Sequence, residues 1–404
     1  MRFNTLISRV GYYSLCLFLC SACSTPQSQV EPQSKLATQY PSDQSLLFWP
    51  QELRTKAFQE MEKIERVRKV AAGDNRRTLA LGETLALSWE FDGQQWDIDS
   101  YMQDQNAAGV VILQNGKVRA EEYRLGFDAE QKWTSFSVAK SFTSTLVGAA
   151  IKDGYIKSID EPLTNYVPEL KGSGYDGVTV KQILTMQSGV QWSEDYTDPN
   201  SDVAQFQTTP SIDGLDPTVV YMRDLKSEAE PGSRWQYNTG ETNLIGVLVA
   251  RATGKYLSDY LSEKIWQPYG MSDDAIWMLN EGGREISGCC ISARVRDYAM
   301  LGMLALEGGV INGESIVPED WFSAAGTKQA DIGVPGFGYG YQWWTTDDGS
   351  YEAKGIFGQG IFIDESLGLV IASNGSWQHA SDTKMKKRRH AFYVAVQAAL
   401  SAQQ

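Results

Sequence analysis

The sequence predicts an α+β fold in which one antiparallel sheet is assembled from both ends of the chain. Strand-like patterns occupy residues 108–124 and return at 336–375, whereas residues 160–280 have mainly helical and loop patterns. The pair Asn115-Gly116 separates two early strand patterns and favours a two-residue hairpin turn. Early and late strands with helices between them predict a sheet that carries packed helices, with the helical region as an insertion.

Length and composition fit one large folded unit or two ordinary ones. The chain has 404 residues, of which 42% are hydrophobic and 21% charged, a balance typical of globular proteins with a sizeable core. The formal net charge is −14, with 50 acidic and 36 basic residues. So acidic a chain is not expected to bind nucleic acid.

The first 23 residues have the pattern of a secretory signal. Arg2 and Arg9 precede a short apolar stretch, and the small residues Ser21-Ala22-Cys23 follow it, as at the cleavage site of a signal peptide. The segment LCSAC resembles a bacterial lipobox, although Cys20 stands where leucine is usual. That resemblance implies cleavage before Cys23, a lipid on its thiol, and a membrane contact through this anchor. Ser24 then favours the periplasmic side of the outer membrane of a Gram-negative bacterium.

The elements that follow are a tether and a folded domain. Residues 24–45 are rich in Ser, Pro and Gln and are typical of a tether, so residues 46–404 form the domain. Residues 50–71 have a helical pattern, and a last helix is expected over 383–402. The stretch 384–390, KMKKRRH, is interpreted as a solvated helix face, with contact to a membrane surface as the alternative.

The strongest chemical signal is a serine and a lysine at the start of an apolar helix. Residues 134–151 read TSFSVAKSFTSTLVGAAI, and Lys140 is their only charge. A lysine one turn after Ser137 lies on the serine's side of the helix, and burial favours its neutral, basic form. The chain has only two histidines, His379 and His390. Lysine is therefore the expected base for a nucleophilic Ser137.

A serine followed three residues later by a lysine occurs a second time in the chain, and this second match tests how much the surrounding sequence matters. Ser381 and Lys384 have the same spacing but run into the charge-rich stretch 384–390. Ser137 instead precedes an uncharged segment that ends at Asp153-Gly154, a helix stop signal. Its place near a helix start also suits the stabilisation of negative charge by backbone N–H groups.

A third element lies in residues 231–240, PGSRWQYNTG, a turn that leads into an apolar helix. Tyr237 follows Ser137 by 100 residues. With these motifs the chain resembles the superfamily of class C serine β-lactamases, penicillin-binding proteins and esterases. Segments 188–203, 235–254, 287–309, 341–344 and 355–364 resemble the 6-aminohexanoate-dimer hydrolases of that fold, from about residue 105 to the end.

The resemblance implies a β-lactamase-like fold and a role for each matched residue. Ser137 would be the nucleophile, Lys140 the base and Tyr237 the proton relay. The backbone N–H groups of Ser137 and Ile356 would form the oxyanion hole. The residues implied to contact the substrate are Tyr196, Thr239, Gly355 and Phe357. No cofactor is implied, and two late histidines without a metal-binding motif favour no metal site.

The sequence departs from the penicillin-recognising members at two places. Lys354-Gly355-Ile356 stands where those members have Lys-Thr-Gly, and Thr239 occupies the asparagine slot after Tyr237. Both departures favour a small amide or ester as substrate. Lys354 could still hold a substrate carboxylate, as Lys-Thr-Gly does in those members, if its side chain pointed into the site. The adjacent Cys289 and Cys290 are expected to be two buried thiols, because a bond between neighbouring cysteines is strained.

Three alternatives stay open at this point. One is a penicillin-binding D,D-peptidase or β-lactamase, and another is a short-chain carboxylesterase of the same fold. The third is a non-catalytic envelope protein that binds or senses a ligand. The sequence indicates no oligomeric state.

Overall fold

The computed structural model describes residues 30–31, 40–41 and 44–403. The expected signal, the lipidation site Cys23 and most of the expected tether lie outside the described residues. Within the part of the chain that is described, no helix has both the length and the apolar character needed to cross a bilayer.

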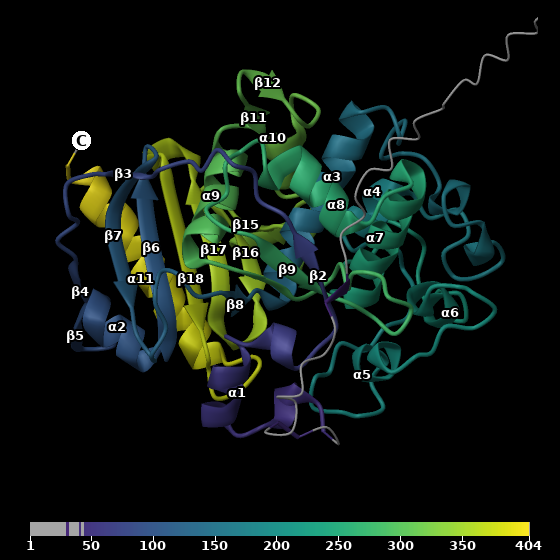
Figure 1. Cartoon of the computed structure of the whole chain (residues 1–404), viewed down its shortest axis with the longest axis horizontal. Coiled ribbons are helices and arrows are strands. Elements are labelled where there is room, and N and C mark those ends of the chain that lie inside the picture. The colour runs from purple at the N-terminus through teal and green to yellow at the C-terminus, as the bar shows by residue number, and fades with distance from the viewer. Residues whose placement is uncertain (1–29, 32–39, 42–43, 404) are drawn as a thin grey trace, which may run out of the picture.

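A nine-stranded sheet forms one half of the molecule (Figure 1). Every neighbouring pair in it is antiparallel except β3 and β7, which are parallel. In spatial order its strands are β13 (Ala330–Asp331), β14 (Phe337–Tyr339), β15 (Trp344–Thr346), β16 (Tyr351–Gly355), β17 (Gln359–Asp364), β18 (Leu369–Gly375), β6 (Ala107–Gln114), β7 (Lys117–Tyr123) and β3 (Ala80–Leu81).

The two ends of the chain meet in the middle of this sheet. Strand β18 pairs with β6, with Ala372 opposite Val111. Between β6 and β7 the turn residues Asn115 and Gly116 have φ values of 49° and 72°, as a tight hairpin of this type requires. The predicted α+β class, with an antiparallel sheet made from early and late strands, is confirmed.

Alternating residues of the central strands supply two separate cores. Val111 and Leu113 belong to the large core that also contains helix α9 (Val295–Leu306). Val110 and Ile112 point to the other face, where they pack in the core of helix α11 (Thr383–Ser401). Successive side chains of a strand lie on opposite faces, so a run of apolar residues in β6 predicts a strand covered on both sides. Figure 1 shows the sheet between these helices.

The helical region lies beside the β13–β16 half of the sheet (Figure 1). It contains the long helix α7 and several short helices that surround it. The helices are α3 (Ala139–Lys152), α4 (Val180–Leu184), α5 (Asp202–Gln207), α6 (Pro217–Met222), α7 (Thr239–Thr253) and α8 (Leu257–Leu261), followed by a π-helical turn at Ser262–Trp266. This agrees with the helical pattern of residues 160–280.

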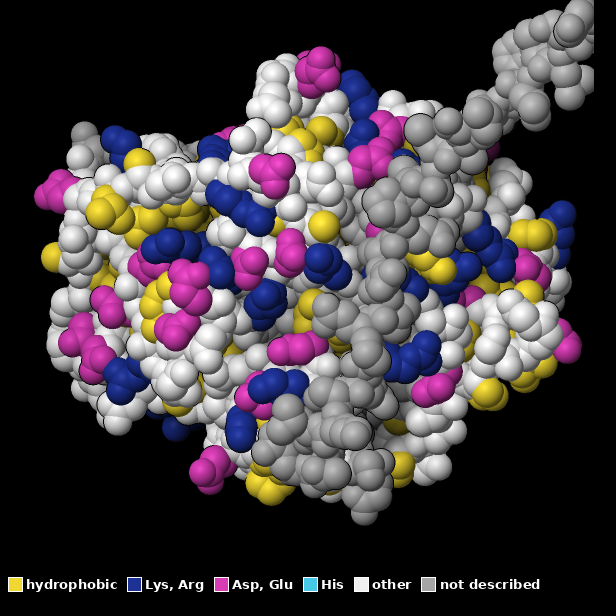
Figure 2. Space-filling model, in the orientation of Figure 1, with side chains coloured by type: hydrophobic (Ala, Val, Ile, Leu, Met, Phe, Trp, Pro, Cys, Tyr) yellow, Lys and Arg dark blue, Asp and Glu magenta, His cyan; other side chains and the backbone are white. Residues whose placement is uncertain are grey.

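Smaller elements complete the molecule. A second sheet has the order β1 (Val30–Glu31), β2 (Val67–Val70), β9 (Ala275–Met278), β10 (Ile291–Ala293) and β8 (Trp133–Thr134). Two hairpins and three helices lie outside both sheets: β4 (Ser88–Phe91), β5 (Gln94–Asp97), β11 (Val310–Ile311), β12 (Glu314–Ser315), α1 (Gln51–Ala57), α2 (Ile98–Asp104) and α10 (Trp321–Ala325). Acidic and basic side chains alternate over the face shown in Figure 2.

The expectation of a helix over residues 50–71 is wrong in its second half. Helix α1 ends at Ala57, and after a 3-10 turn at Met61–Lys63 the chain enters strand β2. Strand β2 pairs with β9, more than two hundred residues away along the sequence. A long-range pairing of this kind leaves little trace in the local pattern, because strand propensity depends on neighbours.

Candidate active site

Ser137 lies in a strained turn between strand β8 and helix α3. The turn is a single 3-10 turn over Phe136–Val138, so α3 begins two residues after Ser137 rather than at Thr134. Phe136 has φ +45°, a left-handed value that non-glycine residues seldom adopt. Its ring packs at 4.9 Å from Phe58 and 5.4 Å from Phe357, which holds the turn in place. Strained backbone of this kind is often found at functional sites.

Lys140 points back at Ser137 from the first turn of α3. Its Nζ lies 3.1 Å from Ser137 Oγ and donates to Thr239 Oγ1 at 3.0 Å and to the Gly288 carbonyl at 2.7 Å. The side chain is 1% exposed. Burial lowers the pKa of Lys140 to about 8, and the Glu194 carboxylate nearby opposes this change. A substantial fraction of Lys140 is therefore a neutral amine near pH 8, as a base for Ser137 must be.

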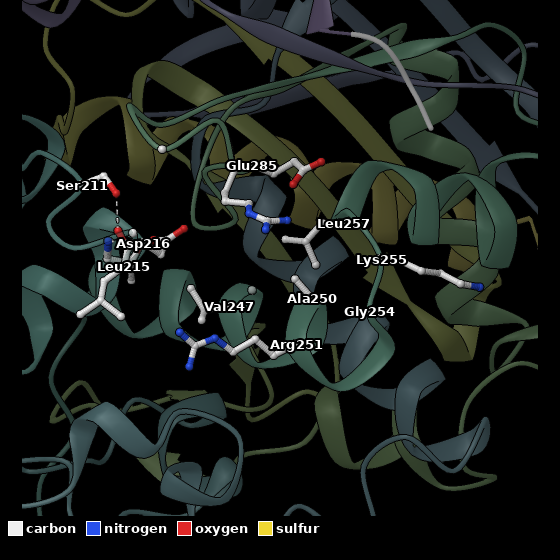
Figure 3. A pocket seen from close by; sticks show the side chains of 15 residues that line it. Ser211, Leu215, Asp216, Val247, Ala250, Arg251, Gly254, Lys255, Leu257 and Glu285 are labelled. Atoms are coloured by element: carbon white, nitrogen blue, oxygen red, sulfur yellow. Dashed lines mark hydrogen bonds between the residues drawn. The ribbon is translucent and has the colours of Figure 1, made fainter. Parts of the chain in front are cut away.

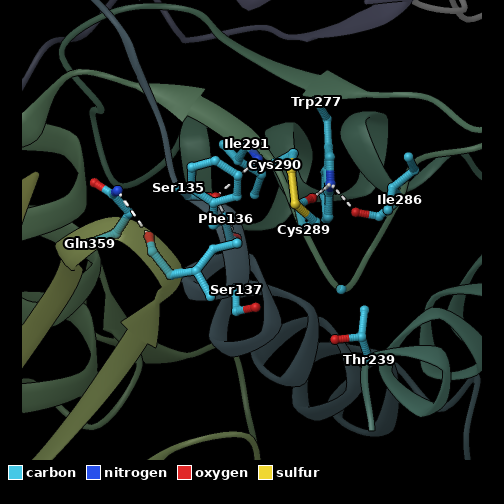
Figure 4. The surroundings of a disulfide bond; sticks show 12 residues. Ser135, Phe136, Ser137, Thr239, Trp277, Ile286, Cys289, Cys290, Ile291 and Gln359 are labelled. Carbon is cyan, nitrogen blue, oxygen red and sulfur yellow. Dashed lines mark hydrogen bonds between the residues drawn. A yellow bond between two sulfur atoms is a disulfide. The ribbon is translucent and has the colours of Figure 1, made fainter. Parts of the chain in front are cut away.

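The Gly288 carbonyl belongs to a turn at residues 286–290 in the connection between β9 and β10, of which Ile286, Cys289 and Cys290 are labelled in Figure 4. A side chain at Gly288 would meet Asn243 Nδ2 at 2.9 Å and Thr239 Cγ2 at 3.0 Å, so only glycine fits beside α7. Trp277 Nε1 fixes the turn further by donating to the carbonyls of Ile286 and Cys289 at 3.0 Å each. The turn thus places one of the three acceptors around Lys140.

Cys289 and Cys290 are joined by a disulfide in this turn, so the expectation of two thiols is wrong (Figure 4). The expectation rested on the strain of a bond between adjacent cysteines. Here Cys290 has φ +71°, in the left-handed region. The disulfide directly follows the carbonyl that binds Lys140.

Tyr237 also lies close to the lysine. The Lys140 ammonium is 5.2 Å from the centre of the Tyr237 ring, and that ring stacks on Trp344 at 5.5 Å. Burial and the Glu194 charge raise the pKa of Tyr237, while contact with the Ser137 hydroxyl opposes the rise. Tyr237 is therefore a neutral phenol at ordinary pH, able to donate a proton and to accept one in return.

Glu194 is a central residue of the site that the sequence analysis did not single out. It accepts hydrogen bonds from the Tyr196 hydroxyl at 2.6 Å, from the Thr239 backbone N–H at 3.0 Å and from the Thr239 hydroxyl. The N–H belongs to the first residue of α7, where a helix favours negative charge. Lys140, Thr239 and Glu194 thus form a continuous chain of hydrogen bonds. Glu194 lies two residues before Tyr196, but no motif marked it.

A cavity of about 700 Å³ opens onto these groups. Five of the expected residues line it: Ser137, Tyr196, Tyr237, Gly355 and Ile356. Two do not. Thr239 lies behind Lys140, and Phe357 is 1% exposed in the aromatic core with Phe58. Neither residue lines the cavity, and their contact with the substrate stays a prediction.

Strand β16 brings Gly355 and Ile356 to the nucleophile. A side chain at Gly355 would lie 2.5 Å from the Ser135 carbonyl, so the strand end is pressed against the chain that leads into Ser137. Ile356 follows directly and turns the chain out of the strand. Ile356, at the end of β16, and Ser137, in the turn before α3, therefore line the same cavity.

A second cavity of about 350 Å³ lies at the far end of α7 (Figure 3). Arg251, Lys255 and Glu285 are among the side chains that line it, and none of the expected catalytic residues does. Over the part of the chain that the structure describes, no three His, Cys, Asp or Glu side chains cluster closely enough to hold a metal ion.

Comparison with known proteins agrees with this arrangement. The β-lactamase family model matches residues 97–393. The 6-aminohexanoate-dimer hydrolase of Paenarthrobacter ureafaciens is 33% identical over 298 residues, which covers 70% of this chain and 75% of the relative. Esterase EstB of Burkholderia gladioli is 25% identical over 322 residues, or 64% of this chain and 81% of the esterase.

Solved structures show the same fold. A Bacillus anthracis protein provisionally named a 6-aminohexanoate-dimer hydrolase superposes with a TM-score of 0.74 at 21% identity, over 86% of this chain and 94% of that one. A class C β-lactamase mutant gives a TM-score of 0.57 at 16% identity, over 76% and 95%. The resemblance drawn from the motifs is confirmed. The chain belongs to the β-lactamase family and is a serine hydrolase related to 6-aminohexanoate-dimer hydrolase.

Proposed function

We propose that the protein hydrolyses small amides or esters through an acyl-enzyme on Ser137. The observation that carries the proposal is the 3.1 Å contact between Lys140 Nζ and Ser137 Oγ at the floor of an open cavity. The relative that shares 33% identity is named a hydrolase of an amide dimer, which favours an amide or a chemically similar ester.

The chemistry proceeds in two halves. Neutral Lys140 takes the proton from Ser137 Oγ as that oxygen attacks the carbonyl carbon, and the N–H groups of Ser137 and Ile356 stabilise the oxyanion. When the tetrahedral intermediate collapses, Tyr237 passes the proton that Lys140 took to the departing amine or alcohol, and Lys140 is neutral again. Water then gives a proton to Lys140 as it attacks the acyl-enzyme, and Lys140 returns this proton to Ser137 Oγ as the acid leaves.

The substitution Ser137→Ala tests this function against a matched control. The variant should lose hydrolysis of short-chain p-nitrophenyl esters and amides, with a thermal midpoint close to that of the wild type. Ser144 lies on the same helix with a buried hydroxyl that has no partner among the described residues, so Ser144→Ala should keep its activity. Wild-type turnover in Ser137→Ala would overturn the assignment.

A short-chain esterase is the second candidate, and the match to esterase EstB favours it. Amide and ester substrates with the same acyl group separate the two functions by their kcat/KM values. Slow or absent nitrocefin turnover is expected, because the strand edge lacks a Lys-Thr-Gly clamp. Efficient turnover would instead favour the β-lactamase alternative.

The proposal includes export. The basic, apolar and small-residue regions of residues 1–23 support secretion to the periplasm, and the lipobox-like segment supports a lipid on Cys23. Metabolic labelling with a fatty acid should mark the wild type and not Cys23→Ser. Equal labelling of both would contradict the anchor.

A further inference from the structure

The disulfide between Cys289 and Cys290 lies beside the expected base and nucleophile, although no step of the proposed reaction uses it. The Gly288 carbonyl just before it accepts from Lys140 Nζ at 2.7 Å. The Cys290 backbone N–H donates to the Phe136 carbonyl at 3.2 Å, and Phe136 directly precedes the nucleophile. One short segment of chain therefore contacts both the base and the turn that carries the nucleophile.

The ring that the disulfide closes contains the peptide group between the two cysteines. Both polar ends of that peptide group are hydrogen-bonded. Its carbonyl, on Cys289, accepts from Trp277 Nε1 at 3.0 Å, and its N–H, on Cys290, donates to Phe136 (Figure 4). Trp277 is fully buried. Because a planar peptide group turns only about the single bonds on either side of it, closing a ring through it restricts the directions in which its carbonyl and N–H point.

Cys290 has a backbone conformation that a cysteine outside such a ring seldom adopts. Its φ is +71°, in the left-handed region where the Cβ of a non-glycine residue is crowded. Its hydrogen-bond partner Phe136 is also left-handed, with φ +45°. Opening the ring would free Cys290 to take a common extended or right-handed conformation, and its N–H would then turn away from Phe136.

A reductant can reach this disulfide through Cys289, which is half-buried, whereas Cys290 is 6% exposed. A thiolate of a dithiol attacks the Cys289 sulfur, the S–S bond breaks, and the Cys290 sulfur leaves as a thiolate. The second thiol of the reductant then displaces Cys289 and closes the reductant's own disulfide. The dithiol is oxidised, and its two protons end on the two cysteine thiols.

We propose that this disulfide positions Lys140 and the Ser137 turn for catalysis, and that its reduction by a dithiol converts the hydrolase to a less active form. The inference rests on the proposed hydrolysis and names a regulation of the same site. Reduction lets the turn move, so that the Gly288 carbonyl no longer holds Lys140 against Ser137. Export, as proposed above, would keep the disulfide formed, because the periplasm is oxidising.

The test compares the oxidised and the reduced wild type. Protein treated with dithiothreitol is desalted under argon, so that free thiol does not attack the ester, and is assayed at once with p-nitrophenyl butyrate. Alkylation and peptide mass spectrometry verify the state of residues 289–290, with both cysteines alkylated after reduction and neither before it. Reduction should lower kcat per folded molecule about tenfold, the cost of a weakened hydrogen bond at the base, and reoxidation should restore it.

The pH profile separates positioning of the base from a general loss of structure. The Gly288 carbonyl accepts from the Lys140 ammonium, so losing this acceptor disfavours the charged lysine. The midpoint of kcat/KM should therefore fall in the reduced form, by about 0.5 pH units or more, from the Lys140 pKa of about 8. Glu194 and Tyr237, the other titratable groups beside Lys140, are the same in both forms.

Two double variants without the disulfide test the role of the backbone. Cys289→Ser with Cys290→Ser should match the reduced wild type and should not respond to dithiothreitol. Cys289→Ser with Cys290→Gly also lacks the disulfide, but glycine adopts a φ of +71° without steric cost. The glycine variant should therefore be about threefold more active than the serine variant. Equal activities would contradict a control that acts through the backbone of Cys290.

The remaining outcomes separate this inference from the function beneath it. If verified reduction leaves kcat and the pH midpoint unchanged, the inference is wrong and the hydrolase assignment stands. The inference is also wrong if the double serine variant still loses activity in dithiothreitol, or if fully active, untreated protein carries free thiols at residues 289–290. If neither form of the wild type cleaves esters, the proposed function fails, and this inference fails with it.

Discussion

At the scale of single residues, the site depends on how Lys140 is kept partly neutral. Its ammonium is buried, which favours the neutral amine, while the negative charge of Glu194 favours the charged form. The two influences set the pKa of Lys140 to about 8. A base with a pKa near the working pH combines an available neutral form with useful basicity.

Activity should therefore rise with pH through a midpoint near the Lys140 pKa of about 8. Activity rises with pH because only the neutral lysine can accept the serine proton, and the neutral fraction of Lys140 decreases as pH falls. Lys140→Ala should lose about a thousandfold or more in kcat, since the serine and its base act as a unit. The pH dependence of kcat/KM for a neutral ester measures the midpoint.

The two histidines provide the control for this midpoint. His390 lines the cavity, and His379 lies just before helix α11. Replacing both with glutamine should leave the pH midpoint where it is. A midpoint that moves in the double variant would mean that a histidine, and not Lys140, is the titrating base.

Glu194 should act as a positioning residue for the lysine. Glu194→Gln removes the negative charge that raises the pKa of Lys140, so the midpoint of the pH profile should fall by about 1 unit. The plateau rate should fall about tenfold, the cost of a weakened hydrogen bond. A lower plateau with an unmoved midpoint would show that Glu194 has only a structural role.

At the scale of elements, the site is assembled where three of them meet. The turn before α3 carries Ser137, the first residue of α7 carries Thr239, and the end of β16 carries Gly355. Close backbone approach holds them together, and glycine permits it at Gly288 and Gly355.

Gly288→Ala tests this close approach. The added methyl group would meet Asn243 and Thr239 and displace the carbonyl that accepts from Lys140, so kcat should fall about tenfold or more. Gly302→Ala is the control, because a methyl group at Gly302 of helix α9 would crowd Val370 of strand β18, away from the site. That variant should lose stability but keep its activity per folded molecule. Equal activity losses in both would contradict a specific role for the turn.

The sequence predicted these elements unevenly, for physical reasons. The hairpin around Asn115-Gly116, the late strands and the last helix all follow from local patterns, and the structure has them. The position of Ser137 in a 3-10 turn was not predicted, because it depends on Phe136 packing against Phe58 and Phe357. Strand β2 was missed since its pairing partner is distant.

The same limit applies to the candidate site. Ser137, Lys140 and Tyr237 belong to short motifs, and the structure brings them together. Glu194 has its role through a residue far away in the sequence. The contact between Glu194 and Thr239 spans 45 positions, and the cavity lining joins α11 to Ser137 across the whole domain.

At the scale of the whole molecule, buried charge near the site should make stability depend on pH. Burial raises the pKa of Glu241 to about 8, with hydrogen bonds from Ser188 and Tyr175 opposing the rise. The folded state then holds a proton that the unfolded state releases above about pH 4.5, so stability falls as pH rises from there to about 8.

Glu241→Gln removes this titration. The variant should gain about 1–2 kcal/mol relative to the wild type at pH 8.5, and little at pH 4.5. Denaturant unfolding at the two pH values measures the difference. A gain of equal size at both pH values would show that the carboxyl does not titrate in this range.

The central claim is that Ser137 is the nucleophile of a hydrolase that works through an acyl-enzyme. Its most direct test is a fluorophosphonate probe followed by mass spectrometry of the labelled peptide. Label should appear on Ser137 alone, disappear in Ser137→Ala, persist in Ser144→Ala, and form faster as pH rises through about 8. Label on another serine, or unchanged labelling in Ser137→Ala, would contradict the account.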